Sequence, residues 1–165
     1  LRFARPGDPE LATVSADQLL REVQQFFAPE LEKAGIRLVL DAPAPCPVSV
    51  DAAQIKQVLI NLVQNAVDSI GHDGTITLRA RPDRRPLAGP EKDVVILEVA
   101  DTGRGIPPEV GKRLFDPFFT TKDHGTGLGL SIAARIVEKH RGALQYQTQV
   151  NRGTTFGIVL PQDLA

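Results

Sequence analysis

Apolar residues recur along this chain with two spacings, and each spacing predicts a different kind of element. Between Ala52 and Ile70 they step by three and one, which is typical of a helix that buries one broad face. Asp51 precedes this helix as a predicted N-cap, with Gln54 three residues on. A shorter helix is predicted from Ser131 to His140, ended by Gly142.

The first helix of the chain is predicted to begin at Ser15, where Gln18 completes an S-x-x-Q capping box. Its apolar stripe ends near Gly35. Pro29 lies inside the stripe and predicts a kink or a break, because proline has no N–H for the helical ladder. Residues 1–9 contain two prolines and a glycine and are expected to be a connector.

Strands are predicted between these helices and after them. The runs are Ile36–Leu40, Val48–Val50, Thr75–Ala80, Val94–Ala100, Ala143–Gln149 and Thr154–Leu160. Residues 81–92, rich in proline and charge, are expected to be a solvated hairpin loop. Strands outnumber helices and often follow one another directly. The order therefore predicts an α+β fold, a two-layer α/β sandwich with helices on one face of a mixed sheet.

Composition narrows the class of protein. A chain of 165 residues with 42% hydrophobic and 24% charged residues is typical of one soluble globular domain. The net charge of -1 gives no global field that favours nucleic acid or an anionic membrane, so no nucleic-acid partner is expected. Cys46 is the only cysteine, which excludes an internal disulfide and favours a reducing compartment. Because the sequence begins with Leu1 rather than Met, we expect it to be a piece of a longer protein.

Residues 101–132 form the most unusual stretch of the chain. Gly103 and Gly105 open it, and a second glycine cluster lies between Gly125 and Gly129. Glycine pairs are used where backbone turns sharply or approaches a ligand, so we expect a loop hinged at both ends. The second cluster runs into a helical pattern, and N–H groups at the start of a helix can face phosphates. Such glycine spacing is weak evidence alone, and neither a Walker A nor a dinucleotide-binding motif is present.

Three polar residues interrupt the apolar pattern of the 52–70 helix. Asn61, Asn65 and Asp68 are spaced four and three, so they share one face. They are a solvated polar face, or the amide oxygens of the two asparagines are ligands for a hard cation such as Mg²⁺.

Further candidates lie in the glycine-bracketed stretch. Asp101 follows a strand expected at the centre of the sheet, and it either forms a turn or accepts a hydrogen bond from an exocyclic amine. Ile106 would offer apolar contact at the same point. Lys122 either reaches a terminal phosphate as a point charge or is a solvated loop lysine. Phe115 and its aromatic neighbours are expected to pin the loop onto the core.

Four ordered stretches resemble the motifs of the GHKL ATPase and kinase superfamily, which has the Bergerat fold. QVLINLVQNAVDSI resembles the N box, DTGRGIP the G1 box, LFDPFFTTK the F box and GTGLGLSI the G2 box, while GTTFGIVLP resembles the last strand. Together they are similar to the catalytic ATP-binding domain of bacterial two-component sensor histidine kinases, and most similar to the nitrogen-regulation-type subgroup. The implied fold is a mixed, mostly antiparallel sheet covered by helices on one face, with an ATP lid.

The resemblance implies a role for each matching residue. Asp101 would bind the adenine amino group, Asn65 would hold Mg²⁺ on the phosphates of ATP, and Thr154 would lie near the adenine. Asn61 and Lys122 are the implied catalytic residues, with Lys122 at the γ-phosphate. The implied cofactor-binding set is Asn65, Asp101, Gly103, Gly105, Ile106, Gly125, Thr126, Gly127, Leu128, Gly129 and Thr154. Phe115 and Phe119 would set the conformation of the lid.

The chain departs from the family pattern at two places. Many members carry a basic residue at the end of the N box, where this chain has Asp68. Many also carry an arginine soon after the F-box aromatics, where this chain has Thr120 and then Lys122. The second departure bears on the γ-phosphate contact.

The resemblance implies transfer of the γ-phosphate from ATP·Mg²⁺ to a histidine on a separate dimerisation domain, the first step of two-component signalling. Residues 1–9 would be the end of that domain and a linker, and residues 10–165 the ATP-binding catalytic domain. The implied location is the cytoplasm, with any membrane anchor in upstream regions. The implied partners are the protein's own dimerisation domain and, through the full-length kinase, a response regulator. The isolated domain is expected to be monomeric.

Two other functions compete with this hypothesis. ATP-hydrolysing relatives use a glutamate, one turn before the Mg²⁺ asparagine, to activate water. Asn61 occupies that position here and is a poor general base, which favours phosphoryl transfer over hydrolysis. The third hypothesis is a non-catalytic nucleotide-sensing or partner-docking module, and the presence of Asn65, Asp101 and both glycine hinges argues against it.

Overall fold

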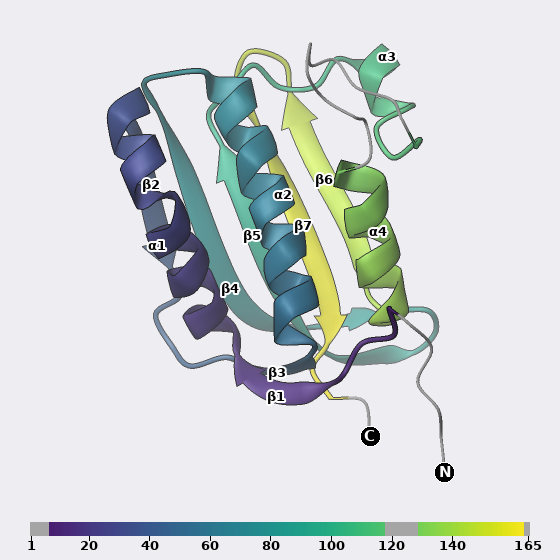
Figure 1. The fold of residues 1–165 in the computed structure, drawn as a ribbon. Coiled ribbons are helices and arrows are strands. Elements are labelled where there is room, and N and C mark those ends of the chain that lie inside the picture. The colour runs from purple at the N-terminus through teal and green to yellow at the C-terminus, as the bar shows by residue number, and fades with distance from the viewer. Residues whose placement is uncertain (1–6, 118–128, 164–165) are drawn as a thin grey trace.

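Five strands form the main sheet, in the order β2-β4-β5-β7-β6 (Figure 1). They are β2 (Ile36–Asp41), β4 (Gly74–Pro86), β5 (Glu91–Asp101), β6 (Ala143–Gln149) and β7 (Gly153–Pro161). The computed structural model describes residues 7–117 and 129–163. β2 and β4 are parallel, and the other neighbours are antiparallel. The predicted mixed sheet is confirmed, and so is the central position of β5.

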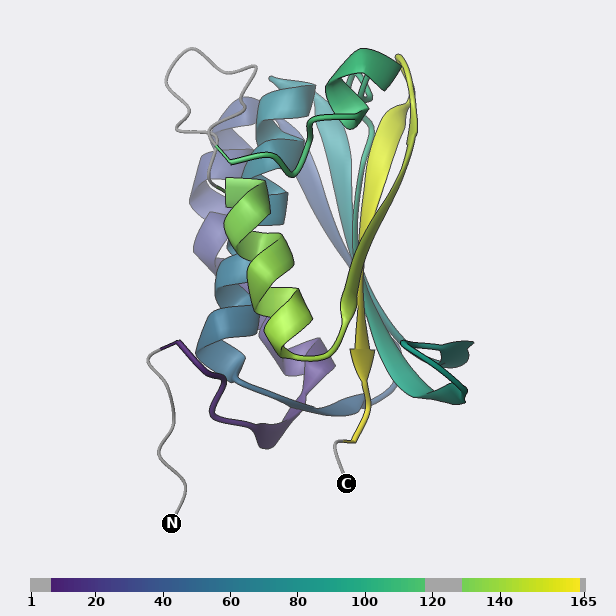
Figure 2. The same cartoon turned by 90° about the vertical axis from the view of Figure 1, so that its right-hand side faces the viewer.

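Helices α1 (Ala16–Ala34), α2 (Ala52–Ile70) and α4 (Gly129–Lys139) cover one face of this sheet (Figure 2). The apolar face of α2 lies in the core, where Ile55, Leu59 and Leu62 are 0% exposed. Burying each such side chain contributes about 1.5–3 kcal/mol, so this face fixes α2 on the sheet. Among the described residues, no helix is both long enough and apolar enough to span a membrane.

The bounds predicted for α2 are confirmed, and so is its N-cap. Asp51 Oδ1 accepts a hydrogen bond from the N–H of Gln54 at 3.2 Å. Such a cap satisfies a backbone donor that has no partner inside the helix. The start of α2 is therefore determined locally.

The capping box predicted for α1 is wrong. Ser15 is the N-cap residue, but its side chain makes no capping hydrogen bond and donates to Asp17 instead. That hydrogen bond is the largest cause that lowers the pKa of Asp17 below its usual value. Asp17 Oδ1 also accepts the N–H of Cys46 at 3.4 Å, so the carboxylate ties α1 to the segment before β3. The helix also continues through the exposed Pro29, so no break occurs there.

A second, two-stranded sheet was not predicted. β1 (Ala12–Ser15) pairs antiparallel with β3 (Pro47–Val50). The four residues of β1 carry no alternating pattern long enough to predict a strand. They form one because β3, far along the chain, offers partner N–H and C=O groups. The short α3 (Pro108–Gly111) was likewise not predicted.

The loop predicted over residues 81–92 is much shorter in the structure. β4 extends to Pro86, which pairs with Glu91 of β5, so only residues 87–90 connect the two strands. The prolines are tolerated because β2 pairs with β4 only as far as Arg79. Beyond that residue β4 is an edge strand, where the missing N–H of proline interrupts no ladder.

Candidate functional site

Several predicted site residues lie at the end of the sheet where β5 ends and β7 begins, the upper end in Figure 1, whereas Asn61 lies at the middle of α2. Asp101 ends β5 there and Thr154 lies at the start of β7, and the two are register partners. Directly opposite residues on antiparallel strands have Cβ atoms about 4.5–5.5 Å apart. The sheet therefore places a carboxylate and a hydroxyl side by side.

Asp101 is half-buried and forms a turn with the residues that follow it. Its Oδ1 accepts the N–H of Gly103 at 2.8 Å. Burial raises the pKa of this carboxyl above its usual value, while hydrogen bonds from the backbone of Gly103 and Thr154 oppose the rise. The turn role is confirmed, and the role as acceptor for an exocyclic amine stays a prediction.

The first glycine hinge is held by the end of α2. A Cβ on Gly103 would collide with Ser69, so only glycine fits against that helix end. The N–H of Arg104 lies 3.2 Å from the hydroxyl oxygen of Ser69 and 3.4 Å from its carbonyl oxygen. Sequence reasoning missed Ser69, which is the residue that fastens the hinge to the N-box helix.

The opposite side of this hinge is held by the β6–β7 turn. The N–H of Asn151 donates to the carbonyl of Arg104 at 2.7 Å, and the N–H of Ile106 donates to Thr148 Oγ1 at 2.8 Å. Gly105 between them has φ 75°, and an added Cβ would lie 2.5 Å from the carbonyl oxygen of Gln149. Both the left-handed backbone and this contact require glycine.

Thr148 is the second residue that sequence reasoning missed. Its Oγ1 also lies 2.9 Å from Oγ1 of Thr154, which is itself buried. One signal was available in the sequence. On β6 the residues Leu144, Tyr146 and Thr148 lie on one face, and the exposed Thr148 continues this row with a hydroxyl that can hydrogen-bond to a neighbouring strand.

The polar face of α2 meets the start of α4. Asn61 Nδ2 donates to the carbonyl of Gly129 at 3.3 Å, and Asn61 Oδ1 accepts from Gln57 Nε2 at 3.1 Å. Asn65 lies one turn further on and is half-buried. Asp68 accepts from Gln64 Nε2 at 3.3 Å and is exposed. The structure thus brings the N box together with the last glycine of the second cluster.

Several predicted residues lie outside the described residues. They are Phe119, Thr120, Lys122, Gly125, Thr126, Gly127 and Leu128. Phe115 is described, and its ring packs edge-on against Tyr146 with centroids 6.1 Å apart. Tyr146 in turn packs on Phe156 of β7 at 5.7 Å. Phe115 therefore pins this segment onto the core, as predicted.

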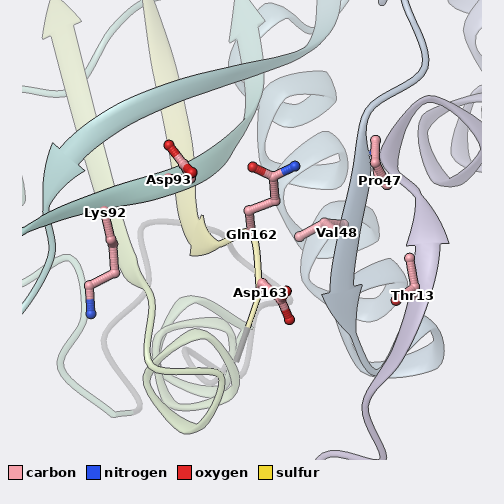
Figure 3. A pocket seen from close by; sticks show the side chains of 7 residues that line it. All are labelled: Thr13, Pro47, Val48, Lys92, Asp93, Gln162 and Asp163. Carbon is pink, nitrogen blue, oxygen red and sulfur yellow. The ribbon is translucent and has the colours of Figure 1, made fainter. Parts of the chain in front are cut away.

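A pocket of about 500 Å³ lies elsewhere, between the β1–β3 ribbon and the start of β5 (Figure 3). Its lining residues are Thr13, Pro47, Val48, Lys92, Asp93, Gln162 and Asp163, and none is a predicted site residue. Lys92 and Asp101 stand near opposite ends of β5, about 30 Å apart at a rise of ~3.4 Å per residue. The pocket is therefore separate from the gathered site. Within residues 7–117 and 129–163, no group of three or more His, Cys, Asp or Glu could hold a metal ion.

Comparison with known proteins identifies the class of this fold and site. The family model of the histidine kinase-, DNA gyrase B-, and HSP90-like ATPases matches residues 50–164. The catalytic domain of the histidine kinase ThkA superposes with a TM-score of 0.80 at 35% identity, covering 93% of this chain and 96% of that one. The chain therefore belongs to this ATPase family, as a GHKL catalytic domain of the bacterial sensor histidine kinase type. Domains of this family bind ATP, and the predicted fold is confirmed.

Two relatives extend the similarity along the chain. The sensor histidine kinase ZraS of Klebsiella oxytoca is 34% identical over 164 residues, covering 98% of this chain and 34% of ZraS. The sensory histidine kinase/phosphatase NtrB of Rhodobacter capsulatus is 32% identical over 188 residues, covering 93% of this chain and 53% of NtrB. The chain thus spans between a third and about half of these relatives. ThkA has also been solved in complex with the response regulator protein TrrA, and that ThkA chain is 31% identical with a TM-score of 0.77, covering 94% of this chain and 42% of ThkA.

Proposed function

We propose that this domain binds ATP with Mg²⁺ and positions the γ-phosphate for transfer to a histidine on a separate dimerisation domain. One observation carries the proposal. Asp101 forms the turn into the first glycine hinge, which Ser69 fastens to the end of α2, and Asn61 on the same helix contacts Gly129 at the start of α4. The same helix, α2, thereby contacts both the turn at Asp101, proposed to bind the base, and the start of α4, proposed to face the phosphates.

The base is proposed to bind beside Asp101 and Thr154. A half-buried carboxylate at the end of a strand accepts a hydrogen bond from the adenine amino group more strongly than an exposed one does. Ile106 is half-buried and packs against the core cluster, so it offers apolar surface next to these polar groups. A few polar anchors in an otherwise apolar site are how small-ligand sites are usually built.

The phosphates are proposed to lie between α2 and the start of α4. Gly125, Thr126, Gly127, Leu128 and Gly129 lead into α4, whose first N–H groups and dipole favour an anion. Lys122 is proposed to approach the γ-phosphate.

The donor chemistry of α2 suits the proposed metal. Asn65 offers an amide oxygen on the face that carries Asn61, and Mg²⁺ takes oxygen ligands with phosphates and waters as the others. The residue that would hold the metal is therefore Asn65. When bound, Mg²⁺ would neutralise charge on the phosphates.

Asn61 favours transfer over hydrolysis. Its amide donates to Gly129, which holds the start of α4 to α2, and accepts from Gln57 of the same helix, so both ends of the side chain are engaged. An amide has no basic site that could take a proton from water. We propose that catalysis rests on positioning and charge neutralisation, with the acceptor imidazole supplied by the partner domain.

The whole protein is proposed to be a two-component sensor kinase of the nitrogen-regulation-type subgroup, supported by the similarity to NtrB. Residues 1–9 would be a linker from the dimerisation domain, and residues 10–165 the catalytic domain. A response regulator is the proposed downstream partner, as in the solved ThkA–TrrA pair. The domain is proposed to act in the cytoplasm, where ATP is available, and to be monomeric when isolated.

A transfer assay tests this function. The domain is mixed with labelled ATP·Mg²⁺ and the dimerisation domain of the full-length protein, and acid-labile, base-stable phosphate on that domain is expected. Asp101→Asn should abolish the signal. Rapid release of free phosphate without phosphohistidine would instead identify a hydrolysing ATPase, and tight nucleotide binding without either product would identify a nucleotide-sensing module.

A further inference from the structure

Thr148 stands at the rim of the site and is bound by groups from two different segments. Its Oγ1 accepts the N–H of Ile106 at 2.8 Å, lies 2.9 Å from Oγ1 of Thr154 and lies 3.3 Å from the carbonyl oxygen of Gly153. Ile106 belongs to the first glycine hinge, whereas Thr154 is the register partner of Asp101. One hydroxyl therefore connects the hinge with the strand that faces the carboxylate.

The hydroxyl proton of Thr148 has two possible acceptors. Hydrogen bonds between oxygens are usually 2.5–3.0 Å long, so the 2.9 Å contact with Thr154 is well formed and the 3.3 Å contact with Gly153 is long. Either hydroxyl of the Thr148–Thr154 pair can be the donor, and donation from Thr148 uses the shorter of its two contacts. A hydroxyl has one proton and two acceptor sites, so in that arrangement Thr154 receives this bond and keeps its own proton to donate elsewhere.

We propose that Thr148 is a positioning residue that makes the hydroxyl of Thr154 a donor toward the bound base while it fastens the hinge at Ile106. The inference deepens the proposed function and rests on it. From adjacent strands, Asp101 then accepts a hydrogen bond from the bound base and Thr154 donates one to it. Adenine presents an amine donor beside a ring-nitrogen acceptor, whereas guanine presents a carbonyl oxygen beside an N–H. The acceptor Asp101 and the donor Thr154 therefore match adenine, and Thr148 maintains this match by fixing the direction of the Thr154 hydroxyl proton.

This role differs measurably from a merely structural one. If Thr148 only stiffened the hinge, its loss would weaken the binding of ATP and the binding of GTP to the same extent. If it directs the proton of Thr154, its loss lets that hydroxyl donate to solvent or turn its lone pairs to the ligand, so preference for ATP falls. The readout is therefore the ratio of the two dissociation constants.

The test compares Thr148→Val, which keeps the shape without the hydroxyl, with Thr148→Ser, which keeps the hydroxyl. The matched control is Thr155→Val, on the opposite face of β7 beside Ala100. Calorimetry measures Kd for ATP and GTP with Mg²⁺, and amide hydrogen exchange reports on Ile106. For the valine variant we expect a five- to tenfold loss of ATP-over-GTP preference, roughly one net hydrogen bond, together with faster exchange at Ile106. The serine and control variants should keep the ratio of the parent.

Each contrary result is distinct. An unchanged ratio in Thr148→Val overturns the inference while leaving the proposed function intact, and so does a serine variant that behaves like valine. If the parent itself binds no ATP, or if Asp101→Asn binds as the parent does, the proposed function fails and the inference fails with it. Should the valine variant melt below the assay temperature, Thr148→Ala removes the hydroxyl without added bulk and carries the same expectation.

Discussion

The N–H of Asp51 donates to Nε2 of His140 at 3.1 Å and joins the start of α2 to the residue that follows α4. The imidazole is 2% exposed, and its Nδ1 lies 2.9 Å from the carbonyl oxygen of Ile136, to which it donates. Asp51 also accepts the N–H groups of Gln54 at 3.2 Å and Glu10 at 2.9 Å. One residue thus ties the N-terminal connector, α2 and α4 together at the end of the sheet remote from Asp101.

Replacing His140 tests this junction. In His140→Leu the partly buried N–H of Asp51 loses its acceptor, and such a loss costs about 1–3 kcal/mol of unfolding free energy. Urea denaturation measures the change. His72→Ala is the control, because the His72 side chain is 82% exposed, and its effect should stay within about 0.5 kcal/mol. Equal effects in the two variants would contradict the junction.

Asp101→Asn is expected to separate binding from folding. The variant should bind ATP at least about a hundredfold more weakly, since it loses a half-buried charged acceptor and places an amide donor against the amine.

The pH dependence of stability gives a second readout at Asp101. Burial raises the pKa of this carboxyl above 3.8, so the folded state binds its proton more tightly than the unfolded chain does. The carboxyl therefore lowers stability as the pH rises from its unfolded pKa through its folded pKa. Without nucleotide, Asp101→Asn should be at least as stable as the parent at pH 7, and its advantage should shrink below the unfolded pKa. Urea unfolding over a pH series measures this, and a variant less stable at pH 7 would contradict it.

Gly105→Ala is expected to loosen the first hinge. Its φ of 75° and the 2.5 Å approach to the carbonyl of Gln149 make any side chain strained, at about 2 kcal/mol or more. Melting temperature and ATP affinity should both fall. The control is Gly157→Ala, because a Cβ at Gly157 would have no atom within 4 Å. This variant should change the free energy of unfolding by less than about 0.5 kcal/mol. A tolerant Gly105 would show that the hinge moves away from Gln149.

Pro29→Ala is expected to stabilise the domain. Proline inside a helix costs about 3 kcal/mol through its missing N–H and ring contact, offset by about 1 kcal/mol from the stiffer unfolded chain. A net gain of about 1–2 kcal/mol should appear as a higher melting temperature. The neighbouring exposed Glu30→Ala should show little change. A loss of stability at position 29 would show that the proline fits a local bend.

Local chemistry was readable from the sequence alone. The step of three and one over Ala52–Ile70 predicted α2 to its ends, and Asp51 predicted its cap, because helix period and capping depend on neighbours a few residues apart. Asp101 followed by Gly103 offered the turn as one of two alternatives for the same reason. The ordered motifs predicted the family, since each is a short stretch with its own backbone requirement.

Contacts between distant segments were decided only by the tertiary structure. β1 exists because β3 pairs with it, and β4 runs on to Pro86 because β5 returns alongside it. Ser15 does not cap α1 because its hydroxyl donates to Asp17, whose carboxylate also accepts the N–H of the distant Cys46. The roles of Ser69 and Thr148 depend on partners dozens of residues away. No local pattern encodes such pairs, because the free energy that selects them arises only when the packed core has brought both segments to the same end of the sheet.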